Sequence, residues 1–460
     1  MSVRRLFDRG GDTESFFTAG RTVGPLVGGA SLTATQVSAG TLVGTVGLHY
    51  LTGVSFTWIW VGIWAGWLTS VLLVAPQLRA HGGYTVPDYL ADRFAGDSDG
   101  AFVRGLAAAL IAVIYLVYTT AQYVAGGVVL DALVGLGTLP SAALLAAVAV
   151  SYTAVGGMRA SVYTDVLQVA LLVVALLAAT AVGVADVGGF RGLAAQTAAV
   201  DPALLAWNHD WTRVGSLAAS FGFGIAVAPY ELSRVYAMRN PATVRSAVGV
   251  AVVIQAAIAA CIATLGVLAR VRYPELSSPD AALVQLALDL FGPIAGVLLL
   301  LGVLAAILST VDSVLLVTSS AVAHDFYEET LPAVRCVAQP SDESVARVAR
   351  AATVAAAVVP VGLTAAAGAL GGLVQFIVAL YASLLAATLF APVLAGLHWR
   401  RATTSGAVAG ILAGFAAVAA WQLLTAPTGV FAWAAGADPV FPGVACSAVA
   451  TVGVSALTED

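Results

Sequence analysis

The sequence has no lysine, few charged residues and few cysteines, and each scarcity narrows what the chain can be. Only 10% of the 460 residues are charged, whereas soluble domains average about 25%. All 20 basic residues are arginines, so a P-loop lysine, and with it ATP-driven transport by this chain alone, is excluded. The three cysteines have no metal-ligand spacing and give no sign of a disulfide framework.

The chain contains many long apolar runs. The chain is 60% hydrophobic, with a mean hydropathy of +0.94, and many runs approach the ~20 residues that a bilayer span requires. A large soluble protein with buried helices does not account for so many runs of that length. The composition therefore predicts an all-α, multi-pass protein of the cell membrane with about twelve transmembrane helices. The expected spans are 22–48, 53–75, 103–130, 139–156, 164–185, 212–233, 246–270, 283–320, 347–367, 372–396, 404–425 and 440–457.

Arginine placement orients these spans. With a cytoplasmic N-terminus, sixteen of the 20 arginines, Arg234 among them, fall in segments on the cytoplasmic side and four fall outside. Because basic residues are enriched in cytoplasmic loops of membrane proteins, this bias supports both the helix count and the orientation. An even number of spans then places the C-terminus in the cytoplasm as well. The run HDFYEE, His324–Glu329, is expected to be a solvated cytoplasmic helix end.

Two of the expected helices contain glycine or proline interruptions. The first carries three glycines in SAGTLVGTVGLHY, and the sixth carries two glycines and a proline in SFGFGIAVAPYEL. Interruptions in corresponding helices of two halves point to a transporter built as an inverted repeat. Ordinary packing of small residues is the alternative, because glycine is common in membrane helices. The five-helix offset between the interruptions favours discontinuous helices.

A cluster of polar residues, Ser309, Thr310, Asp312 and Ser313, lies inside the long apolar run Leu301–Asp325. A charge at the bilayer centre costs at least about 2.5–3.5 kcal/mol on insertion scales, so such residues usually face a partner or a water-filled cavity. Positions 309, 312 and 313 share one face of a helix. Hydroxyl and carboxylate oxygens are hard ligands suited to a small cation. The run therefore predicts an ion-coupled protein.

Seven segments in a fixed order carry a family resemblance. They are ESFFTAGRTVGP, SLTATQVSAGTLVGTVGLHYLTG, YTVPDYLADRF, YTAVGGMRASVYTDVLQ, APYELSRVYAMRNP, ILSTVDSVLLVTSSAVAHDFY and FAPVLAGLHWRRATTSGAVAGILAG. With them the chain resembles the sodium:solute symporter family, which includes proline, pantothenate, monocarboxylate and sugar carriers. The resemblance implies the leucine-transporter-like (LeuT-like) fold, a five-plus-five inverted repeat, followed here by two C-terminal helices. The implied division is a cytoplasmic N-terminus 1–21, a first repeat 22–185, an extracellular loop 186–211, a second repeat 212–396 and the two additional helices in 397–460.

In this family one sodium ion binds between the first and eighth core helices. Motif matching places its ligands at the backbone carbonyls of Ala34, Val37 and Ala306 and at the hydroxyls of Ser309 and Thr310. These oxygens suit sodium chemically, and an unwound helix leaves carbonyls unpaired. The alternative for the hydroxyls is a bond back to a carbonyl one turn earlier. The resemblance thus implies Na+ as the coupling ion and no organic cofactor.

Three further residues are candidates for a second ion or an ion path. Asp165 matches an aspartate on the ion's route to the cytoplasm, which in some members joins a second sodium site. There it acts with hydroxyls at the positions of Asp312 and Ser313. Two carboxylates on one route would attract cations or raise one another's pKa. A second sodium ion, a proton relay and a simple helix cap all stay open.

The solute site is assigned from the same resemblance. Gln36 stands where proline carriers have an essential aspartate, and Phe221 and Ile225 replace larger or more polar aromatic residues, so proline is not the expected solute. The segments around Gln36 and Asp165 look closer to the pantothenate and carboxylate branch. For Tyr118 the alternative role is core packing, and for Gln122 and Gln375 it is hydrogen bonding between helices. The candidate solute-binding residues are Gln36, Ser38, Tyr118, Gln122, Phe221, Ile225 and Gln375.

These observations predict a sodium-coupled secondary symporter that imports a small organic solute, either a carboxylate or a pantothenate-like or amino-acid-like compound, by alternating access. A proton-coupled carrier that uses Asp165 and Asp312 as a relay is the first alternative, and a membrane solute sensor is the second. An enzyme is not expected, because no HExxH or GxSxG motif has a suitable context. The expected partners are the solute, sodium and the lipid bilayer, without nucleic acid. The oligomeric state stays open, a monomer included.

Overall fold

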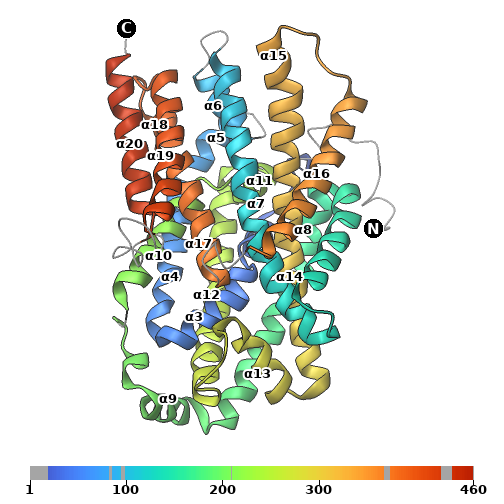
Figure 1. Ribbon diagram of the computed structural model, residues 1–460, viewed down its shortest axis with the longest axis vertical. Coiled ribbons are helices and arrows are strands. Elements are labelled where there is room, and N and C mark those ends of the chain that lie inside the picture. The colour runs from blue at the N-terminus through green and yellow to red at the C-terminus, as the bar shows by residue number, and fades with distance from the viewer. Residues whose placement is uncertain are drawn as a thin grey trace.

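The computed structural model describes residues 19–81, 85–94, 99–208, 210–366, 373–425 and 438–458. Within these ranges every secondary-structure element is a helix, and the helices form one bundle (Figure 1). Nine helical stretches in the described ranges are long and apolar enough to cross a membrane. The all-α membrane fold is therefore confirmed. The count of about twelve spans is not, because the first and sixth expected spans are divided into shorter helices and the fourth, 139–156, is not among the nine.

The first expected span, 22–48, is broken. Helix α2 (Pro25–Gln36) ends where Val37 adopts an extended conformation, with φ −76° and ψ 99°. Helical structure resumes in η3 (Gly40–Gly44), a π-helical segment, and continues into α3 (Thr45–Thr52). A discontinuous first helix is confirmed, although the break lies before the glycines that suggested it.

The glycines of this segment serve close packing instead. A Cβ atom on Gly44 would lie 2.9 Å from the backbone nitrogen of Gln375, and one on Gly40 would lie 2.9 Å from the side chain of Val378. Both contacts are with α17 (Val374–Leu385). The small residues therefore allow α17 to approach the second half of the broken helix.

The sixth expected span, 212–233, is broken as well. It consists of α10 (Trp211–Ala226) and α11 (Pro229–Ala237), separated by two residues with non-helical backbone angles. Pro229 occupies the first turn of α11, where its missing N–H would have no intrahelical acceptor in any case. The proline thus marks the start of the second half-helix, and the predicted interruption is confirmed.

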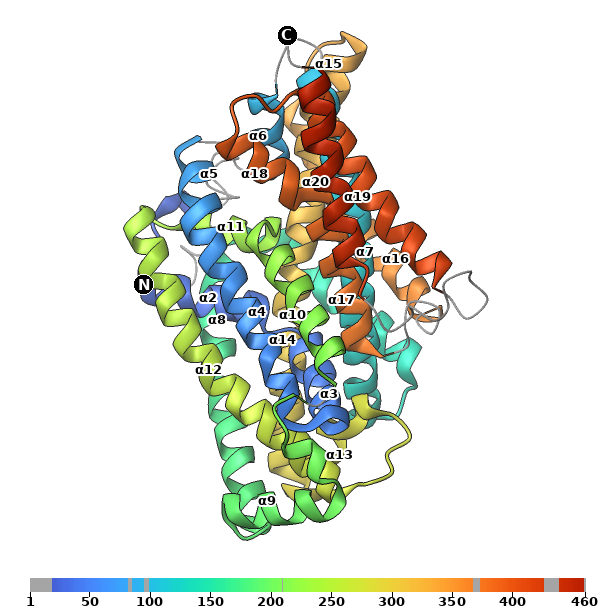
Figure 2. The same cartoon turned by 90° about the vertical axis from the view of Figure 1, so that its left-hand side faces the viewer.

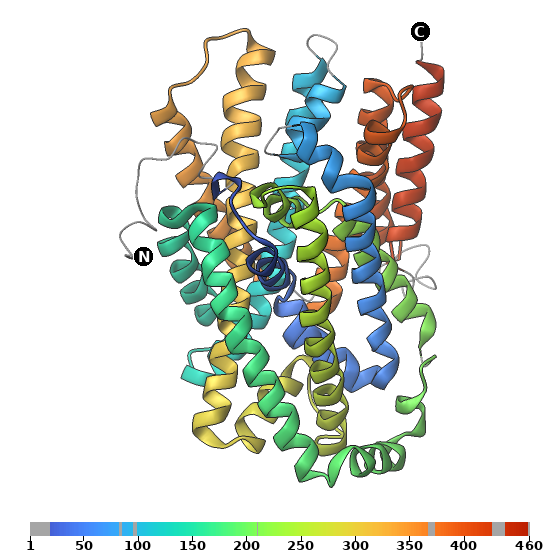
Figure 3. The same ribbon diagram turned by 180° about the vertical axis from the view of Figure 1, so that it is seen from behind.

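The two broken helices are tied together at one end. The N–H of Val23, just before α2, donates to the carbonyl of Ala237 at 3.1 Å, and the N–H of Arg239 donates to the carbonyl of Val23 at 3.2 Å. Helix α2 is seen nearly end-on in Figure 3, so it crosses the long axis of the bundle. The polar backbone groups at the breaks are thereby placed inside the protein.

Longer helices surround these half-helices. Helix α2 packs against α12 and α8, α10 packs against α4, and α17 packs against α7 and α10. Helices α19 and α20 lie side by side at one edge (Figure 1). The bounds are α4 (Trp58–Thr69), α7 (Asp99–Val134), α8 (Thr138–Asp186), α12 (Pro241–Arg272), α14 (Gly292–Ser320), α16 (Asp342–Thr364), α19 (Thr404–Leu424) and α20 (Val440–Leu457).

Shorter elements complete the bundle. They are η2 (Ala19–Arg21), η4 (Gly53–Thr57), η5 (Ser70–Val74), α5 (Ala75–His81), α6 (Val86–Arg93), η7 (Pro279–Ala281), η8 (Ala321–Thr330), α15 (Leu331–Arg335), η10 (Ala386–Phe390) and α18 (Ala391–His398). Gly53, at the turn from α3 into η4, has φ +66°, and a Cβ atom there would lie 1.9 Å from the carbonyl oxygen of Leu204. Only glycine fits that turn.

Two expected boundaries differ from the structure. The expected loop between spans 139–156 and 164–185 is helical, so both lie within α8. The expected span 283–320 is instead divided into α13 (Ala282–Leu290) and α14, because Gly292 has φ +69° between them. Hydropathy alone does not register such changes, since the apolar composition continues through them.

The expected extracellular loop 186–211 also contains helices. It holds α9 (Gly189–Val200) and η6 (Pro202–Leu205). Figure 2 shows α9 lying across one end of the bundle, at the opposite end from α15. A helix of 12 residues is too short to cross a bilayer, so hydropathy does not predict it as a transmembrane span.

Candidate functional site

Side chains from other helices satisfy the backbone groups that the first break leaves free. The N–H of Ala39 donates to Oε1 of Gln122 on α7 at 2.9 Å. The carbonyl of Val37 accepts from Oγ1 of Thr310 on α14 at 3.3 Å. Buried backbone groups need such partners, so these two side chains hold the break open in a fixed shape.

The predicted sodium ligands converge at this point. The hydroxyl of Thr310 lies 3.3 Å from the carbonyl oxygen of Ala306 as well as 3.3 Å from that of Val37. Ala34 lies in the last turn of α2, one turn before the break. Three of the five predicted oxygens therefore meet within hydrogen-bond distance, at the interface of the broken helix and α14. Carbonyl and hydroxyl oxygens are the donor set that a hard monovalent cation would take.

Ser309, the remaining predicted ligand, also bonds a carboxylate. Its hydroxyl donates to Oδ1 of Asp165 at 2.5 Å. The same carboxylate accepts from Oγ of Ser31 at 2.6 Å through Oδ2. A hydroxyl that gives its proton to a carboxylate keeps its lone pairs for a cation. Asp165 is 1% exposed, so it belongs to the interior of the bundle rather than to a solvated helix end.

A buried arginine completes this polar cluster. Arg234, expected in a cytoplasmic segment, lies on α11 with only 1% of its surface exposed. Its Nη2 donates to Oγ of Ser313 at 2.6 Å and to Oγ of Ser161 at 2.8 Å. It also lies 3.4 Å from Oδ2 of Asp165, as an ion pair.

Asp312 and Ser313 belong to the same cluster. Asp312 is 6% exposed and lies close to Arg234 and Ser161. The hydroxyl of Ser313 accepts from Arg234 and donates to the carbonyl of Ser309 at 3.0 Å. Both residues therefore face protein groups on neighbouring helices.

A small cavity lies beside this cluster, between the two breaks. Six of the seven predicted solute residues line it: Gln36, Ser38, Tyr118, Phe221, Ile225 and Gln375. Gln122 does not, because its carboxamide oxygen is held by the backbone of the break. Several larger side chains that the sequence did not predict also line the cavity: Ile59, Trp60, Ile63, Tyr230, Val378 and Tyr381.

Aromatic rings form one wall of the cavity. Tyr118 stacks on Tyr381, with ring centroids 4.1 Å apart and planes inclined by 12°. The hydroxyl of Tyr230 donates to Oε1 of Gln36 at 2.9 Å. Tyr230 directly follows the proline of α11, and Gln36 is the last residue of α2. One hydrogen bond therefore joins the two breaks across the cavity.

Three polar atoms of the lining have no hydrogen-bond partner among the described residues. They are Nε1 of Trp60, a donor, Oε1 of Gln375, an acceptor, and the hydroxyl of Tyr381, and all three are buried. Buried polar groups are almost always paired, so these atoms are free to bind a solute. Every described residue of the lining is uncharged.

A carboxylate at the start of α17 positions Gln375 and Tyr381. The carboxylate of Asp280 in η7 accepts from the N–H of Val374 at 3.0 Å. Burial raises the pKa of Asp280, and the hydrogen bond from Val374 opposes that rise. An acidic group at a helix N-terminus also interacts favourably with the helix dipole. The register of α17 against the cavity is thereby fixed.

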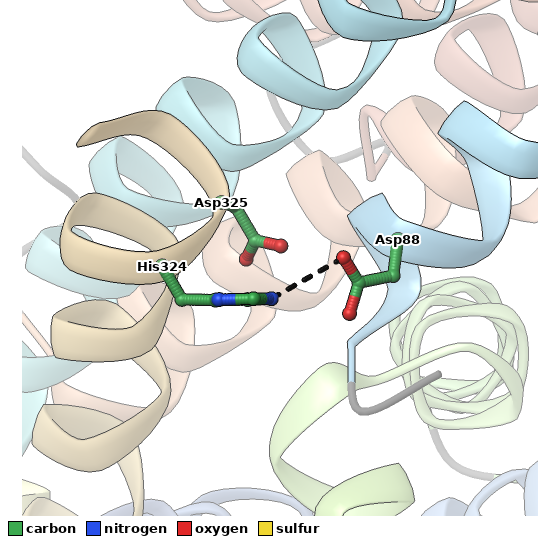
Figure 4. Close-up of side chains that lie close together, drawn as sticks. All are labelled: Asp88, His324 and Asp325. Carbon is green, nitrogen blue, oxygen red and sulfur yellow. Dashed lines mark ion pairs between the residues drawn. The ribbon is translucent and has the colours of Figure 1, made fainter. Parts of the chain in front are cut away.

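A second polar cluster lies away from this cavity and corrects another expectation. Figure 4 shows Asp88 of α6 facing His324 and Asp325 of η8. Nε2 of His324 lies 3.4 Å from Oδ1 of Asp88, and the hydroxyl of Thr85 donates to Oδ1 of Asp325 at 2.7 Å. Asp325 is only 1% exposed, so this part of HDFYEE is buried between two elements and not solvated.

Asp325 also lines a second small cavity. Pro229, Ser233 and Tyr236 of α11 form another wall of that cavity. The half-helix α11 therefore separates two hollow regions, one at the helix breaks and one beside the Asp88–His324–Asp325 cluster.

Two broken helices, freed backbone oxygens facing hydroxyls of another helix, and a cavity at the breaks define a LeuT-like, ion-coupled transporter. The model of the sodium:solute symporter family matches residues 16–414. The chain belongs to that family.

Comparison with characterised proteins agrees with the family assignment. The chain is 29% identical to the high-affinity proline transporter PutP of Bacillus subtilis (strain 168) over 465 residues, covering 98% of this chain and 94% of that protein. It is 26% identical to a sodium/proline symporter of Staphylococcus aureus, covering 98% of this chain and 88% of that protein. The protein is thus a sodium-coupled symporter of the cell membrane.

Solved structures share the fold. A Na+-coupled sialic acid symporter in a substrate-bound, outward-open state superposes with a TM-score of 0.80 at 18% identity, covering 98% of this chain and 94% of that chain. Mhp1, a nucleobase-cation-symport-1 family transporter in a closed conformation with bromovinylhydantoin bound, gives a TM-score of 0.62 at 15% identity, covering 96% and 94%. The LeuT-like fold predicted from sequence is confirmed.

Proposed function

We propose that the protein imports a small organic carboxylate carrying a hydroxyl or amide donor, driven by sodium bound at Ala34, Val37, Ala306, Ser309 and Thr310. The observation that carries this proposal is that the break in the first helix contributes to both the sodium site and the solute cavity. Val37 presents its carbonyl to Thr310, and the next residue, Ser38, lines the cavity. Sodium and solute would therefore act on the same few residues of backbone.

Sodium binding would exchange one set of contacts for another. The hydroxyl of Thr310 donates to the carbonyl oxygens of Val37 and Ala306. A sodium ion at this position takes those lone pairs, and the hydroxyl turns its own oxygen to the ion. Because the ligands come from α2 and α14, the ion would join these helices and favour one arrangement of the carrier over the other.

The cavity suits an anionic group, although no arginine or lysine is among its described lining residues. Helical structure resumes at Ala39, directly after Ser38, and α11 begins at Pro229, directly before Tyr230. Both half-helices thus present N-termini near the lining, where the helix dipole favours negative charge. The N–H groups of Ala39 and Tyr230 already donate to Gln122 and Tyr115, so the dipole is the attraction that remains. This is the arrangement by which broken helices bind substrate carboxylates in LeuT-like carriers.

The unpaired side-chain atoms specify the rest of the solute. Trp60 offers an N–H donor and Gln375 a carboxamide acceptor. Ile59, Ile63 and Val378 add apolar surface to the same lining. A short carboxylate with one hydroxyl or amide group and an apolar body would pair both atoms. A solute without a donor would leave Oε1 of Gln375 unsatisfied, at a cost of roughly 1–3 kcal/mol.

An amino acid is the second candidate, because the two relatives described above are named as proline transporters. Its ammonium group would need oxygen acceptors in the cavity. Gln36 and Gln375 supply carboxamide oxygens, although that of Gln36 already accepts from Tyr230. The uncharged lining favours the hydroxy- or amido-carboxylate.

Alternating access would follow the predicted inverted repeat. We assign the two repeats to 22–185 and 212–396, the N-terminal segment 1–21 and both chain ends to the cytoplasm, and 186–211 to the outside. The cavity beside α11 and Asp325 would then lie on the exit path. Rocking of one repeat against the other would open it as the outer side closes.

A panel of solutes tests this assignment. Purified protein would be heated with hydroxy-monocarboxylates, pantothenate, proline or a neutral sugar, each with sodium and with choline in its place. A bound ligand raises apparent stability by mass action, by ~2.7 kcal/mol at a hundredfold excess over Kd. We expect sodium-dependent stabilisation by the hydroxy- or amido-carboxylates and the same ranking in proteoliposome uptake. Stabilisation by proline alone would refute the substrate class, and equal effects in choline would refute sodium coupling.

A further inference from the structure

The guanidinium group of Arg234 occupies the position expected for a second cation. A second cation at Asp165, Asp312 and Ser313 is one of the three possibilities that the sequence leaves open. In the structure Nη2 of Arg234 lies 2.6 Å from Oγ of Ser313 and 3.4 Å from Oδ2 of Asp165. It also donates to Oγ of Ser161 at 2.8 Å. The oxygens that would ligate an ion are therefore already bound to a positive charge.

These oxygens are oriented toward that charge. Ser313 sends its own proton to the carbonyl of Ser309 at 3.0 Å, which leaves a lone pair for Arg234. Nε of Arg234 is fixed separately, by Oγ1 of Thr35 on α2 at 3.2 Å. All of these side chains are at most 4% exposed. The guanidinium is thus held from α2, α8 and α14 at once, as a bound ion would be.

The fixed charge of Arg234 opposes a second mobile cation among these oxygens. Asp165 and Asp312 are buried carboxylates, as is Glu231 on α11, and an arginine stays protonated under all ordinary conditions. The carboxylates still attract a sodium ion at the neighbouring Ser309–Thr310 site. A further sodium ion among the same oxygens would stand within a few ångströms of the guanidinium and be repelled.

We propose that Arg234 is a tethered cation that takes the place of a second coupling ion and fixes the stoichiometry at one sodium per solute. The inference rests on the proposed sodium site at Val37, Ala306, Ser309 and Thr310. It makes Arg234 the residue that determines how many ions are coupled. Since the arginine lies on the half-helix α11, its charge moves with the carrier and does not cross to the other side.

Removing the tethered charge should open a cation site. In Arg234→Ser the oxygens of Asp165, Ser161 and Ser313 would be left without their donor, and a second sodium ion would fill the space. Arg234→Lys retains a point charge and should keep a single ion. Arg234→Ser combined with Asp165→Asn removes the attracting carboxylate and should also bind one ion. Arg239→Ser is the matched control, because that guanidinium is exposed and bonds the backbone of Thr22.

The experiment counts sodium directly. Equilibrium binding of radioactive sodium to purified protein gives ions per chain, and flux ratios in proteoliposomes give ions per solute. We expect one ion for the wild type, Arg234→Lys, Arg239→Ser and the double variant, and two for Arg234→Ser. Added guanidinium ion should return Arg234→Ser from two bound sodium ions to one, because it can refill the vacated position.

Two results would overturn the inference: two sodium ions in the wild type, or one ion in a folded Arg234→Ser protein with or without guanidinium. If Arg234→Ser does not fold, the wild-type and Arg234→Lys flux ratios decide, and a ratio of two in either is contrary to the proposal. No sodium binding in the wild type would instead contradict the proposed sodium site. The two failures are therefore distinguishable.

Discussion

Replacing Thr310 by valine isolates the contribution of one hydroxyl to sodium binding. Valine keeps the shape of the side chain but removes the oxygen that lies 3.3 Å from the carbonyls of both Val37 and Ala306. The carbonyl of Val37 is at the helix break and has no intrahelical donor. The substitution thus removes a proposed ion ligand and also leaves a buried acceptor without its partner.

The size of the effect follows from the lost ligand. A polar contact with a charged partner contributes ~1.5–3 kcal/mol, whereas the unpaired carbonyl of Val37 is a cost to the sodium-free state alone. For sodium affinity we expect a loss of ~1.5–3 kcal/mol, which corresponds to a rise of roughly 10- to 150-fold in the sodium concentration for half-maximal uptake. The solute concentration for half-maximal uptake at saturating sodium should change much less, since Thr310 does not line the cavity.

Uptake in proteoliposomes over a sodium series measures both quantities. Thr318→Val is the matched control, because Thr318 is buried on the same helix and bonds only the carbonyl of Val314, one turn earlier, at 2.8 Å. It should retain the wild-type sodium dependence. Unchanged sodium dependence in Thr310→Val, or an equal shift in Thr318→Val, would refute the assignment of this hydroxyl to the ion.

Three further predictions follow from the described contacts. Ser309→Ala should weaken sodium binding at least tenfold, because it removes a proposed ligand and the 2.5 Å bond to Asp165; a sodium-dependent melting shift equal to that of the wild type would argue against it. Gln375→Leu should raise the solute KM ~5- to 100-fold while leaving sodium affinity within twofold, since only a solute contact is lost; a sodium effect as large as the solute effect would contradict this role. Thr85→Val should lower the free energy of unfolding by ~1–3 kcal/mol, because buried Asp325 loses its 2.7 Å donor; thermal melting in sodium-free buffer checks this, and an unchanged midpoint would show that the contact adds no stability.

Some features of the site could be found from sequence because they are costly in a membrane helix. Ser309, Thr310 and Asp312 interrupt an apolar run, and the expense of burying them already indicates a polar partner. Pro229 marks the second break for a similar reason, since proline cannot continue a helix. The first break has no such marker, because Val37 and Ser38 are ordinary residues whose non-helical backbone is stabilised by Gln122 and other helices.

Other residues had no signal of their own. Arg234 looks like any cytoplasmic arginine in a count of charges per loop, and only its packing against α8 and α14 shows that it is buried. Trp60 and Tyr381 read as ordinary apolar content of their helices. Their roles depend on which groups face them across the cavity, and those contacts join segments more than a hundred residues apart in the chain.

The sequence alone determined the membrane class, the break before Pro229 and the hydroxyl–carboxylate face, because hydropathy, proline and the cost of buried polar groups act locally. The tertiary structure decided which oxygens meet at the break, which of the predicted solute residues share one cavity, and which cation already lies beside Asp165. The reason is geometric. Hydrogen bonds of about 3 Å form only once the helices pack, and their partners lie far apart along the chain.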